Sequence, residues 1–207
     1  KGVACPCVAD LFEYEQTAYW RICFGQRMRP RKAKWMEFAL DKTIEVLSAT
    51  PAAVRGMLGG LSDEWTSSGG RENWGPYDVV GHLINCDRTN WIPRARVILE
   101  QGADLTFPPF DRFSHFEQSA GKQLRQLIDE FDVVRTASIE TVRDWDLSDS
   151  KLCLKGNHPG FGDVELSQLL ATWTVHDLTH IRQIATSMAK RYDAAVGPWK
   201  TYLSILK

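Results

Sequence analysis

The sequence predicts an all-α protein, a four-helix bundle with a short C-terminal helix. Apolar residues recur with helical periodicity over four long stretches between Met36 and Met188. Loops containing glycine or proline separate these stretches, and no strand pattern is longer than a few residues. No internal repeat points to another architecture. Amphipathic helices joined by modest loops bury their apolar faces by packing against one another, as in a bundle.

Proline and glycine mark the boundaries of the first predicted helices. An amphipathic pattern opens at Met36, and Thr50-Pro51 fits an N-cap followed by proline at the first position of a second helical piece. Gly59-Gly60 ends that piece. The next helix is predicted to start at Trp74-Gly75-Pro76, with glycine as a tolerated cap, and to continue to about Gly102.

The second half of the chain has the same organisation. The turn Phe107-Pro108-Pro109-Phe110 precedes a long helix predicted from about Phe113 to Val142. A glycine-rich loop at 156–162 then leads into a helix over 166–188. Gly197-Pro198 is predicted to start the short C-terminal helix.

Composition places the chain among ordinary soluble globular proteins. Its 207 residues suffice for one domain with a sizeable core, and its formal net charge of −1 favours neither nucleic acid nor an anionic membrane as a partner. No apolar run is long enough for a transmembrane helix, and the N-terminal region lacks the apolar segment of a signal peptide. Five scattered cysteines do not resemble a disulfide framework, so we expect a reducing, cytoplasmic location.

Residues 1–35 differ in character from the rest of the chain. Six basic residues and no acidic residue lie between Arg21 and Lys34, and Met36 opens the first clean amphipathic pattern. We therefore expect residues 1–35 to be an N-terminal extension that does not belong to the native protein, with translation starting at Met36. Residues 36–207 are expected to form the helical-bundle domain.

A pair of histidines four residues apart is the most informative motif. His176 and His180 lie in the helix predicted over 166–188, where this spacing stacks two imidazoles on one face and allows both to bind one metal ion. The motif differs from the H-E-x-x-H of zinc proteases because Asp177 replaces the longer glutamate that acts as base. No histidine or glutamate follows His180, so a third ligand must come from upstream.

Three upstream histidines are candidates for the third ligand. His82 lies in the middle of a helix at the margin of an apolar face, and a facing bundle helix can bring it beside His176 and His180. This geometry favours His82. His158 is predicted to be a turn residue hydrogen-bonded to the backbone, and His115 to cap a helix or line a pocket. Cys86, one turn beyond His82, can approach the metal but is predicted to be a small core residue.

Polar residues project into the predicted core near the histidines. Asp177 falls near the centre of an apolar helix face, where an unpaired carboxylate is costly. It therefore needs a partner, and it is the candidate catalytic residue of the site. Arg94 follows Asp87 and Asn90 along the His82 helix. A buried ion pair of Arg94 with Asp87 or Asp177 is the favoured interpretation, and binding of a substrate carboxylate by Arg94 is the alternative.

The chain resembles the DinB/YfiT-like family of helical bundles with a three-histidine metal site. The matching stretches span roughly Met36 to Lys207 and are Trp74–Leu83, His158–Gly162, His176–Ile184 and Gly197–Trp199. This resemblance implies that His82, His176 and His180 bind a divalent transition metal such as zinc or nickel. One departure is Gly75, where the family often has a serine cap.

The resemblance also implies a function class. Relatives include metal-dependent transferases that use bacillithiol or mycothiol, so we expect a small-molecule enzyme with a low-molecular-weight thiol as a possible substrate. A metal-dependent hydrolase or isomerase is one alternative, and a non-catalytic metal-binding bundle associated with stress is another. A homodimer formed through a bundle face is also expected to be possible.

Overall fold

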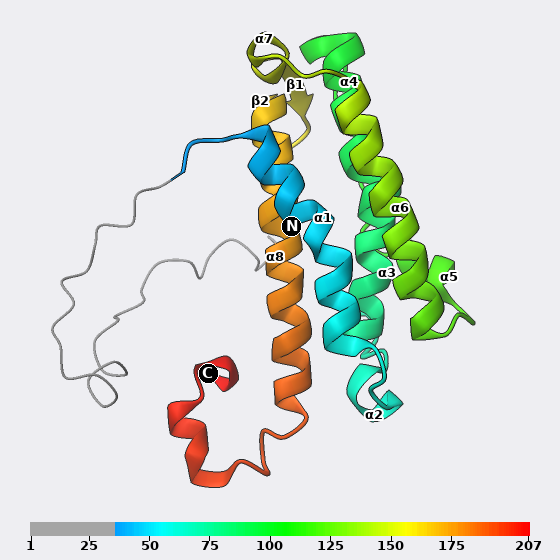
Figure 1. Cartoon of the computed structure of the whole chain (residues 1–207), viewed down its shortest axis with the longest axis vertical. Helices are drawn as coiled ribbons and strands as arrows, with labels where there is room; N and C mark the ends of the chain where they lie inside the picture. The colour runs from blue at the N-terminus through cyan, green and yellow to red at the C-terminus, as the bar shows by residue number, and fades with distance from the viewer. Residues whose placement is uncertain (1–35) are drawn as a thin grey trace, which may run out of the picture. The chain divides into compact units, whose positions relative to one another are not determined.

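The computed structural model describes residues 36–207, and the predicted extension 1–35 lies outside the described residues (Figure 1). The described part is a helical bundle with one small hairpin. Its α-helices and strands are α1 (Leu40–Leu58), α2 (Asp63–Thr66), α3 (Pro76–Cys86), α4 (Ile92–Gln101), α5 (His115–Ser119), α6 (Leu124–Asp144), α7 (Asp149–Leu152), β1 (Lys155–His158), β2 (Gly162–Glu165) and α8 (Leu166–Lys190). A π-helical segment, η2 (Asp87–Trp91), and the 3₁₀ turns η3 (Gly102–Asp104), η4 (Gly197–Tyr202) and η5 (Ser204–Leu206) complete it.

The predicted four-helix bundle is confirmed, with α1, α3, α6 and α8 as its long elements (Figure 1). The helices pack in the cyclic order α1, α6, α3, α8, so the consecutive helices α1 and α3 lie on a diagonal. Helices α3 and α8 are therefore neighbours. This neighbourhood brings the histidine of α3 beside the two histidines of α8. No helix within residues 36–207 combines the length and apolar character needed to cross a bilayer.

Helix α1 is continuous, and the predicted break at Thr50-Pro51 was wrong. Pro51 lies inside the helix, where it has no N–H to donate to the carbonyl of Leu47. Packing of α1 against α6 and α8 holds the helix together across this position. The Thr50 side chain, which was expected to cap a new helix, instead donates to the carbonyl of Val46 at 3.1 Å.

The helix predicted from 74 to 102 is interrupted by η2. Its start is as expected, because Pro76 is the first residue of α3. Asp78 supplies the cap that Gly75 lacks, since its carboxylate accepts the Gly75 N–H at 2.9 Å and the Gly69 N–H at 2.8 Å. Pro93, near the start of α4, has no N–H for the preceding turn, and the chain widens into a π-helical turn just before it.

The single helix predicted over 113–142 is two helices, α5 and α6. Gly121 lies between them with φ +76°, a left-handed conformation that ends a helix. Tyr77 of α3 fixes this turn, because its hydroxyl lies 2.5 Å from the Ser119 carbonyl and 2.9 Å from the Lys122 carbonyl. Helix α6 then begins with the Gln123 N–H bound by the Gln126 side chain at 2.8 Å.

Two apolar clusters fill the bundle. One surrounds Trp173 and includes Ile98 and Phe107, and the other surrounds Phe131 and includes Leu83 and Ile184. On α8 the two metal-site candidates come between Trp173 and Ile184 in the sequence. The histidine pair thus lies where the two apolar clusters meet, with buried packing on both sides along the helix.

The glycine loop at 156–162 forms a hairpin that closes one end of the bundle. Strands β1 and β2 are antiparallel, and the Phe107 N–H donates to the Asn157 carbonyl at 2.9 Å. The strands are only four residues long, which explains why no strand pattern was visible in the sequence. This contact places Phe107 over Gly156.

A side chain at Gly156 of the hairpin would overlap with neighbouring core side chains. A Cβ atom there would lie 2.6 Å from Ile98 Cγ1 and 2.7 Å from Phe107 Cζ. We expect Gly156→Ala to lower the free energy of unfolding by about 1–3 kcal/mol through overpacking, as measured by urea denaturation. Gly160→Ala is the matched control, because its Cβ would meet only His158 at an ordinary 3.7 Å. Equal stability of the two variants would contradict this packing.

Candidate metal centre

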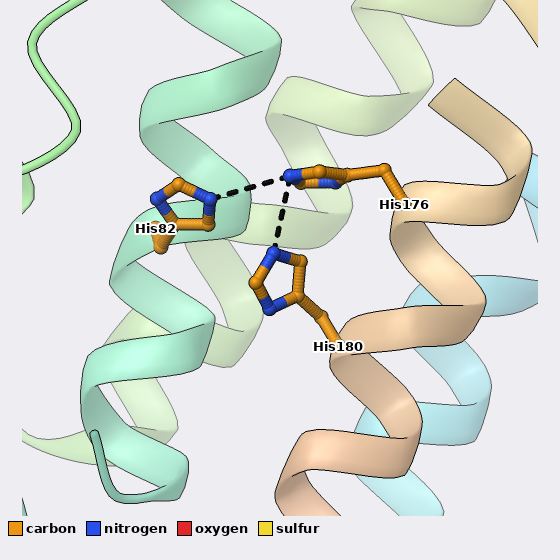
Figure 2. A group of neighbouring side chains, drawn as sticks. All are labelled: His82, His176 and His180. Carbon is orange, nitrogen blue, oxygen red and sulfur yellow. Dashed lines mark hydrogen bonds between the residues drawn. The ribbon is translucent and has the colours of Figure 1, made fainter. Parts of the chain in front are cut away.

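The structure brings three histidines together between α3 and α8. His82 extends from α3, and His176 and His180 extend from successive turns of α8 (Figure 2). The Nε2 atom of His176 lies 3.3 Å from His82 Nε2 and 3.1 Å from His180 Nε2. All three ligand atoms lie within 4.8 Å of one another. The juxtaposition of His82 with the α8 pair, expected from the sequence, is therefore present.

The separations of His176 Nε2 from the nitrogens of the other two histidines fit those between ligands of one transition-metal ion. Zinc–nitrogen bonds of about 2.0–2.1 Å with angles between 90° and tetrahedral place two ligand nitrogens about 2.9–3.4 Å apart. The separations of 3.1 and 3.3 Å lie in that interval. Neutral imidazole suits zinc, nickel, copper and iron, so the donor set selects a transition metal without naming one.

The environment of His82 and His180 favours the neutral form that binds metal. Burial and the neighbouring imidazoles lower the pKa of His180 to about 3 and lower the pKa of His82 still further. Gln183 accepts a hydrogen bond from His180 Nδ1 at 2.8 Å. This bond places the proton on Nδ1 and leaves the Nε2 lone pair directed at the centre.

Aromatic rings form the walls of the centre. The Trp74 ring lies 4.8 Å from the His82 ring, and the Trp91 ring lies 5.0 Å from the His176 ring, both measured between centroids. Phe110 is 6.0 Å from His82 on another side. These rings restrict the rotamers of the histidines and surround the site with apolar surface. Electrostatic interactions are stronger in such a setting than in water.

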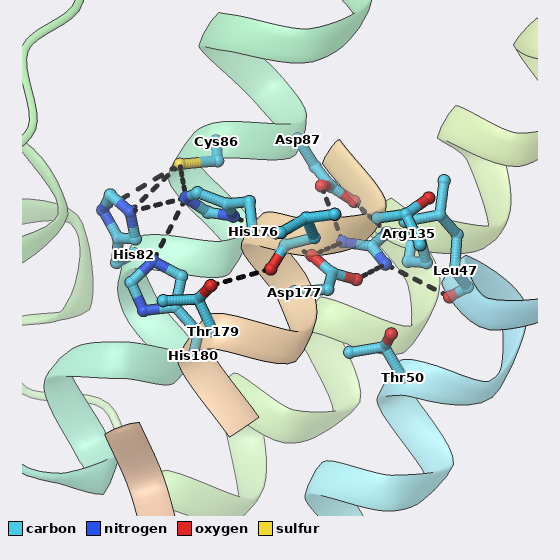
Figure 3. A network of polar contacts seen from close by, with 12 residues as sticks. Leu47, Thr50, His82, Cys86, Asp87, Arg135, His176, Asp177, Thr179 and His180 are labelled. Carbon is cyan, nitrogen blue, oxygen red and sulfur yellow. Dashed lines mark hydrogen bonds and ion pairs between the residues drawn. The ribbon is translucent and has the colours of Figure 1, made fainter. Parts of the chain in front are cut away.

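Next to the histidines lies a fully buried ion-pair network centred on Arg135 of α6 (Figure 3). The guanidinium donates to both oxygens of Asp87, at 2.7 Å from Nε and 3.0 Å from Nη2. It also donates to both oxygens of Asp177, through Nη1 and, at 3.1 Å, through Nη2. Two buried carboxylates therefore share one cation that satisfies both with paired hydrogen bonds.

Arg135 also compensates for the proline in α1. Its Nη1 donates to the carbonyl of Leu47 at 3.1 Å, and this is the carbonyl that Pro51 leaves without a helical donor. One side chain on α6 thus binds α1 through Leu47, η2 through Asp87 and α8 through Asp177. Because Asp177 precedes the turn that carries His180 and follows His176 directly, the network fixes the position of the ligand-bearing part of α8.

The predicted ion pair of Arg94 with Asp87 or Asp177 was wrong, because Arg135 pairs with both acids. Burial raises the pKa of Asp87 to about 6 even with Arg135 opposing the shift. Burial also acts on Asp177, but His176 and Arg135 outweigh it and lower its pKa. Arg94 is half-buried and lies 5.3 Å from the Phe107 ring centroid in a cation–π contact.

The other predicted residues occupy distinct positions. His158 is confirmed as a turn residue, since its Nδ1 accepts the Gly160 N–H at 3.1 Å. His115 is buried, donates from Nδ1 to the Arg112 carbonyl at 2.9 Å, and packs on Trp74 with 4.7 Å between the ring centroids. Cys86 is buried in the core as predicted, yet its sulfur also contacts the histidine cluster.

Sequence reasoning missed Arg135 and Gln183. Arg135 was detectable, because it lies four residues after Phe131 and four before Ile139, on the apolar stripe of its helix. A charged residue at such a position signals a buried partner. Gln183 gave no comparable signal, since a polar residue three positions after a histidine is common on helices.

Removal of Arg135 tests the network. Arg135→Met leaves two buried carboxylates without a cation, so we expect the free energy of unfolding to fall by about 3–5 kcal/mol in urea denaturation. Arg143→Met, at an exposed position of the same helix, is the control and should change stability by less than about 0.5 kcal/mol. A similar small effect for both variants would show that the bundle does not depend on this cation.

Comparisons with known proteins agree with the fold. A structure titled "YfiT from Bacillus subtilis is a probable metal-dependent hydrolase with an unusual four-helix bundle topology" is similar to this chain with a TM-score of 0.63 and 21% identity, covering 79% of this chain and 93% of that one. At this identity the likeness shows a shared fold. No curated protein matches. The DinB superfamily model matches residues 16–184, including part of the segment before Met36. The chain therefore belongs to the DinB superfamily.

Proposed function

We propose that the protein is a metal-dependent enzyme acting on small molecules, with transfer of a low-molecular-weight thiol to an electrophile as its reaction. The observation that carries the proposal is the cluster of His82, His176 and His180, whose potential ligand atoms all lie within 4.8 Å of one another. Three neutral protein ligands would leave a divalent ion its full charge and at least one open position.

A divalent ion bound there would stabilise a thiolate, acidify water or polarise a carbonyl. In the proposed transfer, the thiol sulfur forms a bond to carbon of the electrophile, the bond from that carbon to the leaving group breaks, and the leaving group departs with the electron pair and takes up the thiol proton. His82, His176 and His180 would hold the ion that supplies this chemistry. Trp74, Trp91 and Phe110 exclude water and so limit competing hydrolysis.

Two residues predicted at the site receive separate roles. Asp177 is fully buried, both of its oxygens are bound to Arg135, and its Oδ1 lies 4.0 Å from His176 Nδ1. We therefore propose that it positions His176 instead of transferring protons. Arg94 has no acidic partner among residues 36–207 and is half-buried in a cation–π contact with Phe107. This leaves its charge available, and we propose that it binds an anionic group of the substrate.

A metal-dependent hydrolase is the second candidate. The similar structure of YfiT carries the description of a probable metal-dependent hydrolase, and acidified water would serve hydrolysis at the same three histidines. A non-catalytic metal-binding bundle remains the third. All three candidates bind a metal. The transferase and the hydrolase consume different substrates, and the binding protein consumes none.

The test is a panel of thiols and electrophiles offered to zinc- and nickel-loaded protein. We expect thiol consumption that falls at least about 100-fold in His176→Ala, because loss of one of three ligands removes the metal. His158→Ala is the control, since that histidine lies in the hairpin turn and is bound to Gly160. Its activity should equal that of the unchanged protein.

The other outcomes distinguish the candidates. Hydrolysis of ester or amide substrates without thiol consumption would replace the transferase with the hydrolase. Metal-dependent thermal stabilisation, abolished by His176→Ala but without turnover on any substrate, would favour the binding protein. Absence of metal binding would contradict all three.

A further inference from the structure

Cys86 lies against the three-histidine cluster. It follows His82 by one helical turn on α3, and its sulfur is directed at the same point as the imidazoles (Figure 3). The Sγ atom lies 3.3 Å from His82 Nε2 and 3.8 Å from His176 Nε2. Its side chain is 0% exposed, so no solvent molecule competes for the sulfur from outside.

These distances match those between ligands of one metal ion. With bonds of about 2.3 Å to sulfur and 2.0–2.1 Å to nitrogen, a tetrahedral ion holds sulfur and nitrogen ligands roughly 3.6 Å apart, and a right angle brings them to roughly 3.1 Å. The separation of 3.3 Å from His82 lies within this interval, and the separation of 3.8 Å from His176 lies slightly above it. A cysteine that serves only as a small apolar core residue does not need to lie this close to two imidazole nitrogens.

We propose that Cys86 provides a fourth protein ligand, through Sγ, to the ion held by His82, His176 and His180. The inference rests on the proposed metal centre and adds to it a ligand specific to this chain. Coordination replaces the S–H bond with a sulfur–metal bond and releases the proton to solvent. The thiolate reduces the net charge of the ion and its protein ligands by one.

The fourth ligand has consequences for metal choice and reactivity. A thiolate among imidazoles favours zinc, cobalt or copper over magnesium, calcium or manganese. Substrate binding then requires an ion that expands to five ligands, as catalytic zinc does. An external thiol would enter a site that already contains an internal sulfur ligand.

Cobalt titration tests the inference by a readout that is independent of turnover. Cobalt(II) bound to a thiolate gives a sulfur-to-metal charge-transfer band in the near ultraviolet, in addition to its visible bands. We expect the band in the unchanged protein and in Cys153→Ser, which alters an exposed free cysteine. Cys86→Ser should bind cobalt with the visible bands but without this band, and should bind zinc at least about tenfold more weakly.

The results separate the inference from the proposed function. An equal charge-transfer band in Cys86→Ser and the unchanged protein would overturn the role of Cys86 and leave the histidine centre intact. Failure of the unchanged protein to bind cobalt or zinc would overturn both.

A second measurement requires no variant and covers the case in which Cys86→Ser does not fold. X-ray absorption of the zinc-loaded unchanged protein should show one sulfur neighbour at about 2.3 Å beside nitrogen neighbours at about 2.0–2.1 Å. A shell of nitrogen and oxygen alone would overturn the inference.

Discussion

The contact on which the described structure depends is the guanidinium of Arg135. It binds a carboxylate of η2, a carboxylate of α8 and a carbonyl of α1, and it extends from α6, so one side chain connects all four long segments of the bundle. Each partner has a specific need. Asp87 and Asp177 are buried charges that require a cation, and the Leu47 carbonyl lacks a donor because of Pro51. We infer that the network mainly fixes the alignment of the helices and adds little net stability. The free-energy cost of burying three charges nearly cancels the attraction between them.

Arg135 fixes the alignment of α3 and α8 at the level of the three histidines. Asp87 lies five residues after His82, and Asp177 lies directly after His176, so the same guanidinium aligns α3 with α8 at the level where their histidines meet. At neutral pH two carboxylates and one guanidinium give the network a net negative charge beside the neutral imidazoles of His82 and His180. A cation at the histidines is attracted by that charge across a medium of low dielectric constant. The network thus contributes both the geometry and a favourable potential for a divalent ion.

The bundle and the histidine pair of α8 could be predicted from the sequence because both depend on helical spacing. His176 and His180 share a face at any i, i+4 spacing, and the apolar stripes required helices that pack on one another. The partner of Asp177 could not be chosen in the same way, because it depends on which helices are neighbours. In the ring order α1, α6, α3, α8 the acids of η2 and α8 meet an arginine of α6, whereas Arg94 extends toward Phe107. Two helix boundaries were predicted wrongly. Helix α1 continues through Pro51 because Arg135 supplies the hydrogen bond to the Leu47 carbonyl that the proline cannot donate. The helix predicted over 113–142 is divided because Gly121 adopts a left-handed conformation.

The central claim is that His82, His176 and His180 bind one divalent ion at a position set by the fold. The most direct measurement is anomalous diffraction from crystals of the full chain loaded with zinc, collected on both sides of the zinc absorption edge. We expect a single strong anomalous peak between α3 and α8, about 2.0–2.1 Å from the Nε2 atom of each of the three histidines. A peak held by other residues, or none at the histidines with the metal present in excess, would show that these histidines do not form the metal site.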